Sequence, residues 1–150
     1  MERILVLNGP NLNLLGERDP TLYGTRTLAE IKEELTGKAS ELGVELVLYQ
    51  SNHEGDLIDK IHSERKRCGG IIINPGALTH YSYALRDALE AVALPVIEVH
   101  ISDIKHREEW RRESVISPIA TRVVNGKGWV GYIEALEELV SCMRGGAGGG

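Results

Sequence analysis

Five short apolar runs divide the chain, and each stops at a glycine, a proline or a polar cluster. Runs rich in valine, isoleucine and leucine that stop in this way are typical of strands buried in a parallel sheet. We therefore predict strands over residues 3–8, 44–50, 70–74, 95–100 and 119–124.

Between the strands, apolar positions recur three and four residues apart, as on one face of a helix. Thr27 and Glu30 match a capping box at the start of the first such segment, which stops at Gly43. Later segments predict helices around residues 57–69, 83–92 and 130–140, and a short charged helix over 107–112. Because strands that alternate with helices form a parallel sheet covered on both faces, we expect a five-stranded, doubly wound, three-layer α/β/α fold of the flavodoxin-like kind.

Two segments fall outside this alternation. Residues 9–26 are rich in glycine, asparagine and proline, and a loop of that length in a compact domain is usually functional or disordered. Residues 145–150 are nearly all glycine, which predicts a flexible tail. We assign residues 1–144 to a single catalytic domain.

The composition narrows the class of protein. Hydrophobic residues make up 42% and charged residues 26%, as in soluble globular proteins, and no apolar run is long enough to cross a membrane. A net charge of −5 disfavours a general nucleic-acid binder. The first residues lack the features of a signal peptide, so we expect a cytoplasmic protein. Cys68 and Cys142 lie far apart, which favours reduced packing residues over a disulfide or a zinc site.

Polar side chains stand at the ends of three predicted strands, where ligands bind in open α/β sheets. They are Asn8, Asn11, Asn74, His80, Glu98 and His100. Glu98 and His100 are two residues apart on one strand, so they share a face and can act as a pair, with Glu98 orienting the imidazole. The alternative is that both are exposed at the strand end and have no function. His53, His62 and His106 receive no role.

The sequence offers little for a metal or a nucleotide. His80, His100, His106 and Glu98 lack the tight spacing of zinc ligands, and neither GxGxxG nor GxxxxGK[ST] occurs. We therefore expect chemistry carried by side chains, with no cofactor. Arg18 and Tyr23 lie on the long loop, where a neighbouring guanidinium favours the phenolate form of a tyrosine that takes a proton from carbon. The alternative is that Tyr23 packs and Arg18 is solvated.

Six motifs occur in order over nearly the whole chain before the tail. They are NGPNLNLLG (8–16), RDPTLYG (18–24), INPGALTH (73–80), EVHIS (98–102), REEWRR (107–112) and SPIAT (117–121). Together they resemble the type II 3-dehydroquinate dehydratases. Leu78, Tyr81, Trp110 and residues 103–106 differ from the commonest family pattern, beside the matched positions rather than at them.

The resemblance implies a cofactor-free hydro-lyase that converts 3-dehydroquinate to 3-dehydroshikimate in the shikimate pathway or in quinate catabolism. It implies that Tyr23 removes the proton beside the ketone to give an enolate, assisted by Arg18 and supported by Arg107. Asn11 would hold a water near the enolate oxygen, and His100, oriented by Glu98, would protonate the departing hydroxyl.

The resemblance also implies binding residues. Asn74, Ile101 and Ser102 match the carboxylate site, and His80 and Arg111 match the hydroxyl-binding side. Asp87 matches a residue that is presented to a neighbouring subunit, which implies a homododecamer built as a tetramer of trimers.

A flavin- or phosphate-binding module on the same fold is the alternative, because a fold does not fix a function. A phosphate-receiving domain would carry acidic residues where this chain has Asn8, Asn11 and Asn74.

Overall fold

The computed structural model describes residues 1–145. Apart from Gly145, the predicted tail lies outside the described residues. Within them, a parallel sheet has the strand order β2-β1-β3-β4-β5, which is the flavodoxin-like order, as predicted. The strands are β1 (Glu2–Asn8), β2 (Val44–Gln50), β3 (Gly70–Asn74), β4 (Val96–His100) and β5 (Arg122–Asn125).

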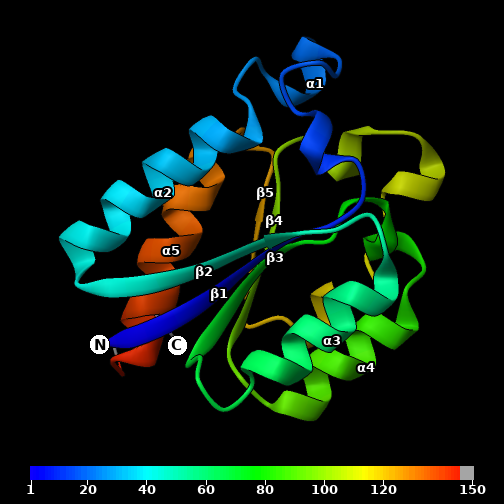
Figure 1. Ribbon diagram of the computed structural model, residues 1–150. Helices are drawn as coiled ribbons and strands as arrows, with labels where there is room; N and C mark the ends of the chain where they lie inside the picture. The colour runs from blue at the N-terminus through cyan, green and yellow to red at the C-terminus, as the bar shows by residue number, and fades with distance from the viewer. Residues whose placement is uncertain (146–150) are drawn as a thin grey trace.

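Helices cover both faces of the sheet, which gives the predicted three layers (Figure 1). They are α1 (Pro20–Tyr23), α2 (Leu28–Leu42), α3 (Glu54–Glu64), α4 (Tyr83–Val92) and α5 (Val130–Met143). Alternation along β1 explains the two cores that result. Ile4 and Val6 pack with α2 and α5, whereas Leu5 and Leu7 pack with α3 and α4.

Helix α2 begins and ends where the sequence predicts. The Thr27 hydroxyl accepts from the Glu30 amide at 3.1 Å, and the Glu30 carboxylate accepts from the Thr27 amide at 3.0 Å. Gly43 ends the helix in the left-handed region with φ 72°. The capping-box prediction is confirmed.

The segment between β4 and β5 differs from the prediction. The short charged helix predicted over residues 107–112 is absent; the 3-10 turn η4 (Glu109–Arg111) lies there instead, and another 3-10 turn, η3 (Ile104–His106), precedes it. Five of the six residues in 107–112 are charged and offer no apolar stripe, so packing cannot stabilise an α-helix. A third turn, η5 (Ser117–Ile119), occupies the start of the predicted last strand, and β5 begins only at Arg122.

The long loop after β1 contains two short helical pieces. The 3-10 turn η1 (Leu12–Leu14) is followed by α1, whose first turn is capped by Asp19 through a 2.9 Å bond from the Thr21 amide. Leu12 and Leu15 are buried. The loop thereby places α1 beyond the carboxyl ends of the strands (Figure 1).

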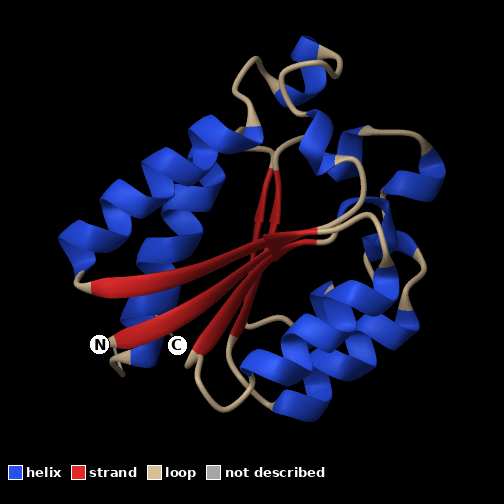
Figure 2. Ribbon diagram, viewed as in Figure 1, coloured by secondary structure: helices blue, strands red, loops and turns tan. Residues whose placement is uncertain are grey.

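The loops after β1 and β3 leave the sheet side by side and in close contact (Figure 2). The Gly9 amide donates to the Asn74 carbonyl at 2.8 Å. A Cβ on Gly9 would lie 2.4 Å from the Pro75 carbonyl oxygen, and one on Gly76 would lie 2.9 Å from the Pro10 carbonyl oxygen. Glycine is therefore required on both sides of this contact.

No helix within residues 1–145 is long and apolar enough to span a membrane.

Candidate active site

A cleft opens where the carboxyl ends of β1, β3 and β4 meet the loops that follow them. The predicted site residues that line it are Asn11, Arg18, Tyr23, Asn74, His80, His100, Ile101, Ser102, Arg107 and Arg111. Glu98 lies behind His100, and Asp87 lies elsewhere. The prediction that the ends of three strands meet at one cleft is confirmed.

Tyr23, the last residue of α1, presents its hydroxyl oxygen to two guanidinium groups. Arg18 Nη2 donates to this oxygen at 2.8 Å, and Arg107 Nη1 donates to it at 3.0 Å. The Arg18 guanidinium also lies 3.8 Å from the centre of the Tyr23 ring. Arg107 is held in turn by a 3.0 Å bond from Nη1 to the Ser102 hydroxyl. Two cationic donors on one oxygen stabilise negative charge on that oxygen.

Glu98 and His100 form a buried pair on β4. Nε2 of His100 is hydrogen-bonded to Oε2 of Glu98, and the two residues are 5% and 0% exposed respectively. The alternative that both are exposed at the strand end is wrong. Burial alone would raise the pKa of Glu98, but the hydrogen bond and charge of His100 and nearby serine hydroxyls outweigh it, so the pKa lies below its ordinary value. Glu98 is thus held as a carboxylate.

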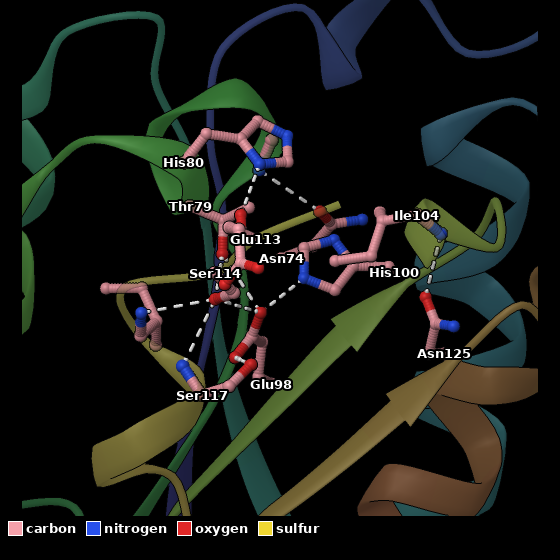
Figure 3. A network of polar contacts seen from close by, with 12 residues as sticks. Asn74, Thr79, His80, Glu98, His100, Ile104, Glu113, Ser114, Ser117 and Asn125 are labelled. Carbon is pink, nitrogen blue, oxygen red and sulfur yellow. Dashed lines mark hydrogen bonds and ion pairs between the residues drawn. The ribbon is translucent and has the colours of Figure 1, made fainter. Parts of the chain in front are cut away.

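Three hydroxyl groups complete the surroundings of Glu98 (Figure 3). The Ser117 hydroxyl donates to Oε1 at 2.7 Å, while those of Thr79 and Ser114 lie 2.9 and 2.8 Å from Oε2. Thr79 and Ser114 are also 2.7 Å from each other. Thr79, Ser114 and Oε2 of Glu98 thus form three close contacts with only two hydroxyl protons between them. Because each hydroxyl donates one hydrogen bond, only two of these three contacts are hydrogen bonds at any one time.

His80 and Arg111 lie on one side of the cleft. Nδ1 of His80 is 2.6 Å from the Glu113 carbonyl oxygen, and its ring packs edge-on against Trp110 at 5.4 Å. Burial lowers the pKa of His80 below its ordinary value, so the ring is neutral near pH 7 and donates through Nδ1. Nε2 of this tautomer is an acceptor. The Arg111 guanidinium pairs with Glu108 at 2.6 Å.

Comparison with known proteins decides the family. The family described as Dehydroquinase class II matches residues 2–140. The chain belongs to this family. It is 53% identical to the 3-dehydroquinate dehydratase of Halothermothrix orenii over 147 residues, covering 98% of this chain and 99% of that protein. It is 49% identical to the 3-dehydroquinate dehydratase of Bacillus subtilis over 145 residues, covering 97% and 98% respectively.

A solved structure supports the same class II dehydroquinase fold. The type II dehydroquinase from Butyrivibrio crossotus superposes with a TM-score of 0.90 and is 46% identical, covering 92% of this chain and 97% of that one. The resemblance stated from sequence motifs is therefore confirmed.

Asp87 is the one predicted site residue of this dehydroquinase that stands apart from the cleft. It is exposed on α4, beside a shallow surface groove that it shares with Tyr83 and Arg86. Within this chain, Asp87 does not join the other site residues.

Sequence reasoning missed several residues around the dehydroquinase site. Thr79, Ser114 and Tyr132 were given no role, although the first two contact Glu98 and the third contacts Asn74. For Tyr132 a signal existed, because a tyrosine inside a helix's apolar stripe needs a buried partner for its hydroxyl. Thr79 lies in the 3-10 turn η2 (Gly76–His80) and Ser114 lies outside any helix or strand, and neither carries such a signal.

The zinc alternative weighed from the sequence finds no geometric support in this dehydroquinase. Within residues 1–145, no three His, Cys, Asp or Glu side chains gather closely enough to hold a metal ion. His106 is 83% exposed at its side chain and pairs with Asp103 rather than with His80 or His100.

Proposed function

We propose that this chain converts 3-dehydroquinate to 3-dehydroshikimate and water through an enolate, using side chains alone. The observation that carries the proposal is the Tyr23 oxygen, which accepts hydrogen bonds from both Arg18 and Arg107 in a cleft that also holds His100. A phenolate stabilised in this way is a base placed to remove a proton from carbon. Family membership supplies the identity of the substrate.

The first step is removal of the proton beside the ketone. The Tyr23 oxygen takes this proton, and the electron pair of the carbon–hydrogen bond moves onto the carbonyl oxygen to form the enolate. Asn11 lines the same cleft and holds a water that donates to the enolate oxygen. Donors fixed before the reaction stabilise the developing charge without reorganisation.

The second step is loss of the hydroxyl group. Nε2 of His100 is committed to Glu98, so Nδ1 is the ring nitrogen that delivers a proton to the departing oxygen. The enolate electrons re-form the ketone as the carbon–oxygen bond breaks, and water leaves. Glu98 has the role of holding the imidazole in this orientation.

The remaining cleft residues bind the substrate in this scheme. Asn74 and the segment of Ile101 and Ser102 receive the carboxylate, where amide and hydroxyl donors suit an anion. His80 and Arg111 receive hydroxyl groups on the other side. The His80 tautomer fits this role, because Nε2 accepts from a hydroxyl.

We also propose that the enzyme works as a cytoplasmic homododecamer, a tetramer of trimers, in the shikimate pathway or in quinate catabolism. The placement of Asp87 supports an assembly. Its side chain is exposed and outside its own cleft, so it can reach a substrate only in a neighbouring subunit.

The experiment that tests the function follows the absorbance of the conjugated enone product after 3-dehydroquinate is added to chelated protein. Wild type should turn over, and Tyr23→Phe should lose about 10²- to 10⁴-fold in kcat, the usual contribution of a general base. Tyr49→Phe is the control, since Tyr49 lies on β2 outside the cleft. No turnover by folded wild type would reject the assignment, and a yellow purified protein would favour the flavin-binding alternative.

A further inference from the structure

Tyr132 joins the ends of two strands beneath the cleft. It lies on the first turn of α5 and is 0% exposed. Its hydroxyl donates to Asn8 Oδ1 at 2.6 Å and accepts from Asn74 Nδ2 at 2.9 Å. Asn8 and Asn74 are paired residues at the ends of β1 and β3. One phenol therefore fixes two buried carboxamides from neighbouring strands.

The direction of these bonds follows from a backbone donor. The Gly76 amide lies 3.2 Å from Asn74 Oδ1, and a backbone N–H can only donate, so the oxygen of this carboxamide must face Gly76. Nδ2 of Asn74 then faces Tyr132, whose single proton is left for Asn8 Oδ1. This arrangement also uses the single phenolic proton, which a turned Asn8 carboxamide would leave without an acceptor.

This orientation of Asn74 suits the binding of an anion, because it leaves an N–H donor for the ligand. Tyr132 uses one of the two Nδ2 hydrogens, and the other is the one that Asn74 can offer within the cleft. A carboxamide turned over would instead present an oxygen, which repels a carboxylate. We propose that Tyr132 is a positioning residue that holds the Asn74 amide nitrogen toward the substrate's carboxylate. This inference rests on the proposed function of the cleft.

The chemistry of a buried phenol suits this task. Burial raises the pKa of Tyr132, so the hydroxyl keeps its proton throughout the working pH range and always donates to Asn8. A buried hydroxyl without partners would cost free energy, and here both of its hydrogen-bonding functions are used. A phenylalanine would fill the same space but leave Nδ2 of Asn74 without the phenol, so that the long 3.2 Å bond from the Gly76 amide would have to orient the carboxamide.

The test compares steady-state kinetics of wild type, Tyr132→Phe, Asn74→Ala and the double variant with 3-dehydroquinate. Tyr132→Phe should raise KM about 10-fold and change kcat less than about twofold, because the lost interaction binds substrate and transition state alike. In the Asn74→Ala background, adding Tyr132→Phe should change KM less than about twofold, because the residue through which it acts is gone.

Two controls separate positioning from simple destabilisation. Tyr49→Phe removes a hydroxyl outside the cleft, and Leu139→Ala weakens the far end of α5; both should leave KM unchanged. If Tyr132→Phe does not fold, Asn8→Ala is the second variant, because it removes the acceptor of the Tyr132 hydroxyl and leaves the Tyr132–Asn74 hydrogen bond in place. It should raise KM less than Tyr132→Phe, and again only when Asn74 is present.

The outcomes are distinct. Wild-type turnover with an unchanged KM in Tyr132→Phe would reject the positioning role alone, as would an equal rise in KM with and without Asn74. A wild type that folds and does not turn over 3-dehydroquinate would reject the proposed function and this inference with it.

Discussion

Glu98 has no exposed surface, and side chains take the place of water around its carboxylate. An imidazole and three hydroxyls supply the donors that a buried anion requires. These donors come from β4 itself, from the turn after β3 and from the long segment before β5. The orientation of His100 therefore depends on residues far from it in the sequence.

Removal of one of these hydroxyls should make stability depend on pH. The pKa of Glu98 is depressed in the folded state, so its contribution to stability is present above the unfolded value of about 4.3 and is lost as pH falls through the folded value. Ser117→Ala removes the donor to Oε1 and should lower the free energy of unfolding by about 1–3 kcal/mol near pH 7. Thermal unfolding from pH 7 to pH 3 should show this difference shrinking as Glu98 becomes protonated.

Ser63→Ala is the matched control, because the exposed Ser63 hydroxyl donates only to the Lys60 carbonyl. It should leave the pH dependence unchanged. A deficit of equal size at every pH in Ser117→Ala would show that the hydroxyl acts on packing rather than on the Glu98 carboxylate.

At this scale the sequence indicated the candidate catalytic residues but not the hydroxyl groups that contact Glu98. Glu98 and His100 stand out because a charged side chain costs free energy when it is buried at a strand end. Tyr23 stands out because it lies in an unusually long loop. Ser114 and Thr79 do not stand out, because serine and threonine are ordinary in irregular segments. Their role depends on a fold that brings two loops onto one carboxylate.

At the scale of elements, the regular helices and strands followed from local patterns. Helix α2 has the capping box, the apolar stripe and the final glycine in one continuous segment. The segment 101–121 has none of these signals, because its conformation is determined by side chains such as Arg107 and Ser114 that reach back to the cleft. Tertiary contacts of this kind cannot be read from periodicity.

The cap of α2 should contribute measurably to stability. Thr27→Ala removes the acceptor for the Glu30 amide and should lower the free energy of unfolding by about 1 kcal/mol. Urea unfolding measures the change. Thr25→Ala, two residues earlier and also exposed, should have no comparable effect; an equal loss there would mean that the cap is not the cause.

Two glycines should respond in opposite ways to alanine. A Cβ on Gly9 meets the Pro75 carbonyl, so Gly9→Ala should cost about 1–3 kcal/mol, as overpacking does. Gly37 lies inside α2 with nothing within 4 Å of the added atom, so Gly37→Ala should stabilise the protein by about 0.5–1 kcal/mol. Chemical denaturation of both variants measures the two changes in the free energy of unfolding. An unchanged stability in Gly9→Ala would show that the backbone around Gly9 can shift to accept the added methyl group.

At the scale of the whole molecule, strand order followed from the alternation of strands and helices, whereas the homododecamer was implied only by the family resemblance and stays a prediction. Alternation of strands and helices restricts the topology strongly, because crossovers are right-handed. The proposed contact of Asp87 with a second subunit depends on a partner surface, and no pattern within one chain specifies such a surface.

Mixed subunits test the proposed assembly. Asp87→Ala and Tyr23→Phe should each have low activity, but refolding the two together should restore part of it. Some sites would then combine an intact Tyr23 with an intact Asp87 from a neighbour. Analytical ultracentrifugation should show one species of twelve subunits. A monomer, or mixtures no more active than their components, would contradict the placement of Asp87 in a neighbouring site.

The close contact between the loops after β1 and β3 has a mechanical consequence. Gly9 and Pro75 pack so tightly that the two loops cannot move closer, and the hydrogen bond from the Gly9 amide to the Asn74 carbonyl opposes their separation. We therefore expect the strand ends that carry Asn8 and Asn74 to form a stiff floor beneath the cleft.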